Sequence, residues 1–256
     1  MTATPAASRS VPPLGGFNLT ALRLEVRRVL RNRRTLLFVL VFPSMFFLMF
    51  SSSARRGSGD NGGLAYLMIS MAVYGAMVGT TAGGAAVAVE RSLGWSRQLR
   101  LTPLRPAAYV AMKVLTAMTL GFIAVAAEFS VGAMTGVRVG AEVWLLAGLG
   151  AWLGSLVFAA FGLFMGFLLP SENVMQFVGP VLAILAMFGG LFIPVQMLPP
   201  TMQAIAKWSP VYGVGQIARA PLVGGLTTMA VVSVVLWTVA FGIGAMALFR
   251  RDTARV

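Results

Sequence analysis

The ionisable side chains limit the chemistry that this 256-residue chain can do. It has 20 Lys and Arg, 7 Asp and Glu, and neither His nor Cys. Without His and Cys, the chain offers no Cys/His metal site and no Ser–His or Cys–His nucleophilic pair. An intramembrane aspartyl dyad needs two buried Asp, whereas Asp60 and Asp252 lie outside the apolar runs. The residue types therefore disfavour an enzyme.

A site for ATP hydrolysis is also missing from the sequence. A phosphate loop ends in Gly-Lys-Ser or Gly-Lys-Thr, because its amides and its lysine hold the phosphate groups. The two lysines, Lys113 and Lys207, do not follow a Gly. We expect this chain to bind no cofactor or metal ion, and any ATP-driven step requires a partner.

Glu128 is the one acidic residue well inside a long apolar run. A carboxylate within a membrane is costly, so it is a candidate functional group by default. Glu128 lies late in its run, close to the end of the predicted span. Two interpretations stay open: a local structural pairing, or a place on the route of a transported substrate.

The elements that must position these groups are membrane helices. Hydrophobic residues make up 58% of the chain and charged residues 11%, too few to cover the surface of a soluble domain. The net charge is +13, but the basic residues lie between apolar runs. Anionic lipids are therefore the expected partners of these residues, and we expect no nucleic acid.

Six apolar runs are long enough to cross a bilayer as helices, which takes about 20 residues each. They are continuous rather than alternating, so a β-barrel is not expected. The sequence predicts an all-α integral membrane protein: a transmembrane domain over 17–250, a disordered tail over 1–16 and a cytoplasmic tail over 251–256. The predicted spans are 35–53, 63–89, 107–135, 143–169, 174–193 and 226–249.

The basic residues set the orientation of these spans. With six spans, 15 Lys and Arg fall on the side of the two termini and 5 on the other side. Because Lys and Arg accumulate on the cytoplasmic side, both termini are predicted to be cytoplasmic.

Two segments outside the spans have their own patterns. Residues 17–34 alternate an apolar stripe with an arginine stripe at helical spacing, which predicts an amphipathic helix at the membrane interface. The same arginines also act as a simple topology signal. Residues 194–225 contain five Pro and scattered apolar side chains, which predicts an external re-entrant hairpin before the last span.

The loop between the second and third spans is a candidate docking element. Its apolar residues Leu93, Trp95 and Leu99 are anchors of the kind that dominate protein interfaces. Glu90 and Arg91 begin the loop, and Pro103 ends it. The loop either forms a short helix that binds a protein partner or rests on lipid headgroups.

Small residues in the second span predict close helix packing. Gly75, Gly79 and Gly83 recur every fourth residue, so one helix face lacks side chains and a neighbour can approach closely. We interpret them as packing residues rather than as part of a route.

The order of these elements resembles the membrane-spanning subunit of type-two ATP-binding cassette exporters. Three stretches carry the resemblance: Glu90–Leu104 is similar to the family's loop, Gly189–Pro199 to its fifth-span ending, and Ile205–Tyr212 followed by Arg219 to its external hairpin. The core of the loop, Leu93-Gly94-Trp95-Ser96, departs from the usual family pattern.

The resemblance implies a prokaryotic cell-membrane transporter powered by ATP on a separate ATPase subunit, present in two copies. It also implies a second membrane subunit, identical or homologous, and docking of the loop on the ATPase. The expected substrate is a hydrophobic drug, antibiotic or lipid, as in multidrug efflux. The alternative is a non-transporting membrane assembly or haem-export factor.

Overall fold

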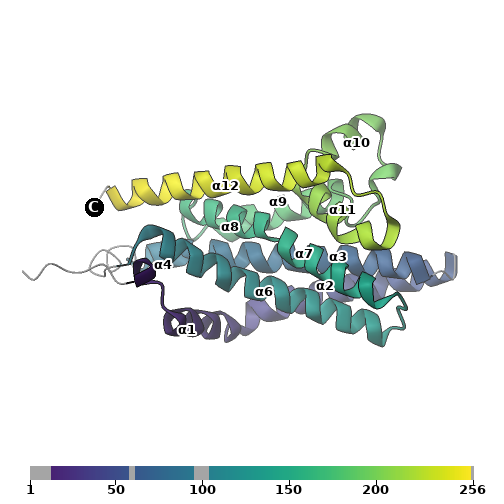
Figure 1. The fold of residues 1–256 in the computed structure, drawn as a ribbon, viewed down its shortest axis with the longest axis horizontal. Coiled ribbons are helices and arrows are strands. Elements are labelled where there is room, and N and C mark those ends of the chain that lie inside the picture. Colours follow the sequence, from purple (N-terminus) through teal and green to yellow (C-terminus); the bar gives the residue numbers. More distant parts are fainter. Residues whose placement is uncertain (1–12, 58–60, 95–103, 255–256) are drawn as a thin grey trace, which may run out of the picture.

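The computed structural model describes residues 13–57, 61–94 and 104–254. In this part of the chain every regular element is a helix and there are no strands, so the all-α prediction is confirmed (Figure 1). The elements are η1 (Pro13–Gly16), α1 (Leu19–Leu30), α2 (Arg33–Gly57), α3 (Asn61–Ala85), α4 (Val87–Ser92), α6 (Pro106–Met134), α7 (Ala141–Gly154), α8 (Leu156–Leu168), α9 (Val174–Phe188), η2 (Val195–Met197), α10 (Pro200–Ala206), α11 (Pro210–Val223) and α12 (Thr228–Ala254).

Within the described residues, five helical stretches are long and apolar enough to cross a membrane. The bundle they form has two distinct ends. One end, here the α4 end, carries α4 and the C-terminus, and the opposite end, here the α10 end, carries α10 and α11 (Figure 1). The five stretches are Arg33–Ser52, Asn61–Ser92, Ala107–Met134, Ala141–Leu168 and Thr228–Asp252.

The predicted fifth span, residues 174–193, is shorter in the structure than the sequence suggested. Helix α9 has 15 residues, or about 22 Å, whereas a membrane core is about 30 Å thick. The helix stops because Gly190 adopts a positive φ of 84°, and the amide of Leu191 donates to the carbonyl of Ala186 at 3.0 Å. This is a Schellman-type ending, for which glycine is suited. The count of six spans is therefore not established by helix length alone.

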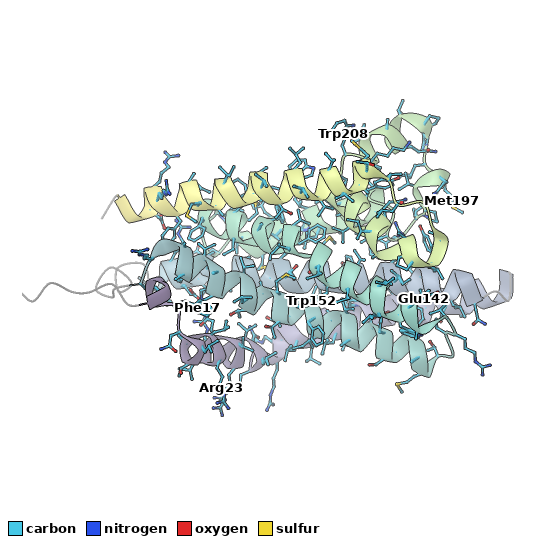
Figure 2. All side chains as sticks on the ribbon, in the orientation of Figure 1. Phe17, Arg23, Glu142, Trp152, Met197 and Trp208 are labelled. Carbon is cyan, nitrogen blue, oxygen red and sulfur yellow. The ribbon has the colours of Figure 1, made fainter. Side chains whose placement is uncertain are left out.

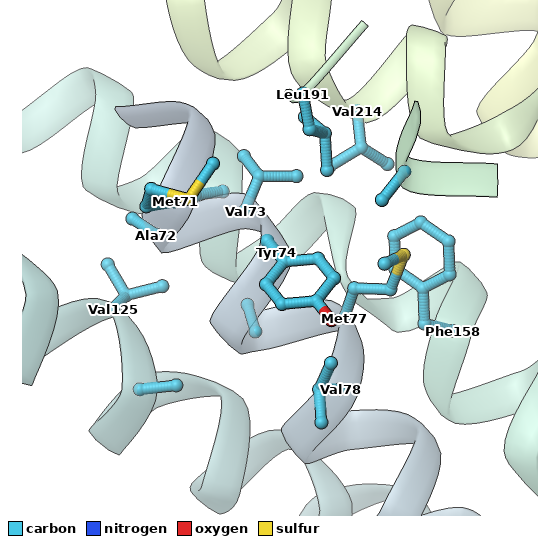
Figure 3. Close-up of a cluster of buried hydrophobic side chains, with 14 of the residues drawn as sticks. Met71, Ala72, Val73, Tyr74, Met77, Val78, Val125, Phe158, Leu191 and Val214 are labelled. Atoms are coloured by element: carbon cyan, nitrogen blue, oxygen red, sulfur yellow. The ribbon is translucent and has the colours of Figure 1, made fainter. Parts of the chain in front are cut away.

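Helix α3 occupies the centre of the bundle. Its residues Met71, Tyr74 and Met77 are buried among side chains of several other helices (Figure 3). Phe158 of α8 and Val214 of α11 belong to the same buried cluster. Helix α12, in contrast, packs chiefly on α8 and α11 and exposes most of its apolar surface. Such exposed apolar surface fits contact with lipid.

The glycines predicted to pack lie on the α3 face that meets α2 and α6. A Cβ added to Gly83 would lie 2.7 Å from Cα of Ala117, closer than real Cβ atoms approach. At Gly79 it would lie 3.1 Å from Val39 and 3.3 Å from the carbonyl oxygen of Leu120. At Gly75 it would contact Pro43 at 3.2 Å. The missing side chains thus let α2 and α6 approach the backbone of α3.

Candidate functional site

The candidate docking loop begins at the end of α4. Glu90 and Arg91 lie in this short helix, and Leu93 follows it with 76% of its surface exposed. Trp95 and Leu99, the other two predicted anchors, lie outside the described residues. The structure therefore shows how the loop is rooted, and one of its apolar anchors faces outward.

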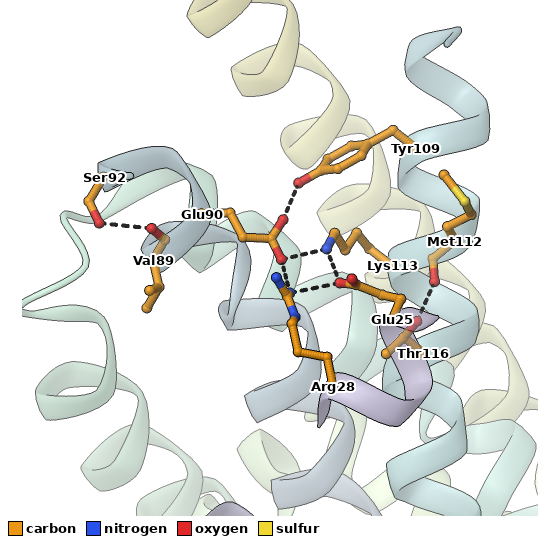
Figure 4. A network of polar contacts seen from close by, with 9 residues as sticks. All are labelled: Glu25, Arg28, Val89, Glu90, Ser92, Tyr109, Met112, Lys113 and Thr116. Carbon is orange, nitrogen blue, oxygen red and sulfur yellow. Dashed lines mark hydrogen bonds and ion pairs between the residues drawn. The ribbon is translucent and has the colours of Figure 1, made fainter. Parts of the chain in front are cut away.

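Glu90 is the centre of a polar network although only 5% of it is exposed. Its Oε1 accepts hydrogen bonds from Lys113 Nζ at 2.5 Å and from Arg28. Its Oε2 accepts from the hydroxyl of Tyr109 at 2.8 Å. The donors come from two helices, α1 and α6, as Figure 4 shows. A single carboxylate therefore ties the last turn of α4 to both.

Glu25 completes the charge balance of this network. Its carboxylate accepts from Arg28 Nη2 at 2.8 Å and from Lys113 (Figure 4). Two acids thus face two bases, and the Lys113 side chain is only 6% exposed. A buried charge is tolerated when it has an opposite charge and hydrogen bonds, and each of these groups has both. We call Glu25, Arg28, Glu90, Tyr109 and Lys113 the Glu90 network.

Arg28 is the most exposed member of the network. Partial burial lowers the pKa of its guanidinium, but the hydrogen bond and the negative charge of Glu90 outweigh that effect. The pKa of Arg28 is therefore raised above its ordinary value. The cation is the favoured form at this position, as the ion pair requires.

Local sequence explains how α1 presents its two network residues. Asn18 caps the helix, since its Oδ1 accepts from the amide of Thr20 at 2.8 Å. Glu25 and Arg28 are three residues apart and so lie on one face of α1, the spacing at which side chains meet on a helix. Tyr109 and Lys113 share a face of α6 in the same way, four residues apart.

Arg91, next to Glu90, points to a different pair of helices. Its Nε and Nη2 donate to the two carboxylate oxygens of Asp252 in α12, at 2.5 and 2.8 Å. Its Nη1 donates to the carbonyl of Gly166 in α8 at 3.0 Å. Arg91 is therefore paired within the chain, and it connects α4 to α12 and α8.

Glu128 is buried in α6, with 1% of its surface exposed. Its Oε2 accepts from the hydroxyl of Ser44 in α2 at 2.8 Å, and its Oε1 has no hydrogen-bond partner among the residues that the structure describes. The local pairing that the sequence left open is therefore present, with a neutral partner. The other oxygen keeps its capacity to accept a hydrogen bond.

Arg219 is a second deeply buried ionic residue, 3% exposed, on α11. Its Nη1 donates to Ser70 Oγ at 2.9 Å and to the carbonyl of Gly190 at 3.0 Å, and its guanidinium lies 4.6 Å from the ring centre of Tyr66. Among the described residues no carboxylate forms an ion pair with it. Arg219 joins α11 to α3 and to the end of α9.

Sequence reasoning missed the partners of the network residues. Glu25 carried a signal, since it is the one acid among the arginines of residues 17–34. Lys113 and Asp252 gave none, because their partners lie 23 and 161 residues away in the chain. Within the described residues no group of three His, Cys, Asp or Glu could hold a metal ion.

Two comparisons with known proteins bear on the site. Residues 18–223 match the family described as "ABC-2 type transporter". The chain is also 28% identical over 207 residues to the protein named "Putative transport permease YvfS" of Bacillus subtilis (strain 168), covering 80% of this chain and 84% of that protein. The matched family region includes the Glu90 network and ends before α12.

Proposed function

The chain belongs to the ABC-2 type transporter family, and from this premise we propose that it is the export pathway of an ATP-driven transporter. It is a multi-pass transmembrane subunit of such a transporter, and its family implies a separate ABC ATPase as partner. The observation that carries the rest of the proposal is the Glu90 network, because it joins the root of the docking loop to α1 and α6.

The proposed mechanism uses this rigid root. ATP binds to the ATPase subunit, whose closure pushes on the loop of residues 90–102. Since Glu90 is fixed to α1 and α6, a displacement of the loop moves those helices rather than bending α4. Two such membrane subunits, identical or homologous, then alternate between inward-open and outward-open arrangements, and the substrate leaves between them.

The proposed substrate is a hydrophobic drug, antibiotic or lipid. Helix α2 exposes apolar side chains, among them Phe38, Met45 and Met49. Such a surface suits either an apolar substrate pathway or contact with lipid. Glu128 is part of the proposal, because its partnerless Oε1 can accept a hydrogen bond from a polar group of the substrate when the helices separate.

The proposed setting is a prokaryotic cell membrane with both termini in the cytoplasm, as the distribution of basic residues favours. Helix α9 then completes six spans where the bilayer becomes locally thinner around it. On the cytoplasmic side of this arrangement, Leu24, Arg27 and Arg28 of α1 and its C-cap residue Arg31 line a groove of about 410 Å³. Three arginines beside an apolar side chain suit an anionic lipid headgroup.

The docking loop can be tested with a matched pair of triple variants. In one, Leu93, Trp95 and Leu99 are replaced by Ala; in the other, Met197, Ile205 and Trp208, exposed apolar residues of the α10 end, are replaced by Ala. We expect the first variant to lose its co-expressed ATPase subunit on purification and to lose efflux of a hydrophobic dye, at an unchanged membrane level. The second variant should retain the ATPase. Retention of both ATPase and efflux by the first variant would refute the docking role.

A further inference from the structure

The contacts of Arg91 extend the loop root to the last helix of the chain. Arg91 and Asp252 form a two-pronged ion pair, with Nε and Nη2 each donating to one carboxylate oxygen. Such forked pairs fix orientation as well as distance. Their side chains are 25% and 31% exposed, so the pair is only partly screened by solvent. The pair joins α4 to α12 across 161 residues of sequence.

The position of Arg91 at α8 has a specific cause in the sequence. The carbonyl of Gly166 would normally accept from the amide of the residue four positions on, but that residue is Pro170, which has no amide hydrogen. Arg91 Nη1 supplies the missing donor at 3.0 Å. The C-terminus of a helix also carries a partial negative charge, which attracts a guanidinium. Arg91 is therefore held at this end of α8 by charge and by hydrogen bonding.

Asp252 is unfavourably placed for its own helix. It lies in the last turn of α12, where the partial charge of the helix is negative and a carboxylate is disfavoured. Helix α12 otherwise packs on α8 and α11. The pair with Arg91 thus offsets the unfavourable position and connects α12 to α4. Adjacent residues of a helix point about 100° apart, so Glu90 and Arg91 can hold α4 from two sides.

We propose that Asp252 is a positioning residue for the ATPase-docking loop: through Arg91 it fixes the end of α4 against α8 and α12. The Glu90 network secures one side of the loop root and the Arg91–Asp252 pair secures the other. Helices α1, α6, α8 and α12 then move together when the ATPase pushes the loop. This inference rests on the proposed docking role of the loop, and it adds α12, which lies beyond the matched family region.

The first test is a double-mutant cycle on ATPase retention. Asp252→Asn, Arg91→Gln and the double variant are purified with the co-expressed ATPase subunit, at equal membrane level. Each single change should lower ATPase affinity about fivefold, as loss of about 1 kcal/mol does, and the double variant should be no weaker than Arg91→Gln. Asp252→Glu, which keeps the charge, should retain most of the affinity. Glu172→Gln, an exposed acid in the turn after α8, is the charge-matched control.

The second test reads the position of α4 directly. The chain has no Cys, so two introduced cysteines can carry spin labels without background. With labels at Ser92 and Met175, both exposed, we expect a narrow distance distribution in the native complex. It should broaden in Asp252→Asn and remain narrow in Glu172→Gln. An unchanged distribution in Asp252→Asn would overturn the positioning role.

The two tests separate this inference from the proposed function. If Asp252→Asn retains native ATPase affinity and a native distance distribution while alanine at Leu93, Trp95 and Leu99 releases the ATPase, the inference is wrong and the docking role stands. If alanine at those anchors does not release the ATPase, the docking role is wrong. The distance distribution then still decides whether Asp252 holds α4.

Discussion

Two regions of this bundle differ in the partners of their buried charges. At the α4 end, Glu25 and Glu90 face Arg28 and Lys113, so opposite charges compensate one another. Elsewhere in the bundle, Glu128 and Arg219 are almost fully buried, yet their hydrogen bonds are to neutral groups. Figure 2 labels Arg23 toward the α4 end and Met197 and Trp208 toward the α10 end.

This difference predicts different consequences of neutralising each charge. Removing one member of a balanced cluster leaves its partners buried and uncompensated, which is strongly destabilising. Neutralising a charge that has only neutral partners removes a desolvation cost and leaves hydrogen bonds that an amide can partly keep. The α4 end therefore behaves as a rigid structural joint, whereas neutralising Glu128 or Arg219 should cost less stability, because the desolvation penalty that is removed offsets part of the lost contacts.

The largest effect is expected at the joint. Glu90→Gln leaves the two bases Arg28 and Lys113 with a single acid, Glu25, and should lower the free energy of unfolding by about 3 kcal/mol. Adding Lys113→Met should recover part of the loss, because the uncompensated base is then removed as well. Thermal unfolding of the purified protein in detergent measures the loss and its recovery. Glu142 is an exposed acid at the start of α7, so Glu142→Gln is the control. Additive losses would show that the two groups do not compensate each other.

A smaller effect is expected at Arg219. Arg219→Gln loses the contact with the Tyr66 ring and weakens the bonds to Ser70 and Gly190, but it also removes a buried charge. We expect a loss of about 1 kcal/mol in the same unfolding assay. A loss equal to that of Glu90→Gln would mean that Arg219 has an anionic partner, and the contrast between the two regions would fail.

The smallest effect on stability is expected at Glu128. In Glu128→Gln the amide oxygen can still accept from Ser44, so the unfolding free energy should change by less than about 0.5 kcal/mol. Efflux of a hydrophobic dye should nevertheless fall at an equal membrane level, because the amide has an NH2 group in place of the second oxygen and cannot accept the proposed hydrogen bond from the substrate. Parallel loss of protein and efflux would assign Glu128 to structure alone.

The helical architecture could be predicted from the sequence more fully than the contacts of the Glu90 network. Five apolar runs predicted helices that are long enough to span, because hydropathy over 20 residues is a local property. The run at 174–193 predicts a longer helix than α9, since its apolar composition continues beyond Phe188, where the conformation of Gly190 ends the helix. Helix termination here depends on backbone conformation, to which hydropathy is insensitive.

The candidate functional residues could be predicted from the sequence, but their partners could not. Glu90, Arg91 and Leu93 could be singled out because they flank a loop between spans, and Glu128 because it interrupts an apolar run. Their partners could not be predicted, because Arg28, Lys113 and Asp252 meet them only through packing of distant helices. Many arginines and few acids offered many possible pairings. Tertiary structure was needed to choose among them.

Cross-linking from Leu93 tests the central claim that the α4 end receives the ATPase. Leu93 and Met197 are each 76% exposed, at opposite ends of the bundle, so a photoreactive residue at either site samples its surroundings equally well. In the complex with the co-expressed ATPase subunit, we predict that the probe at Leu93 forms a covalent adduct with the ATPase and that the probe at Met197 does not. Adducts with lipid alone at Leu93, or an ATPase adduct at Met197, would contradict the account.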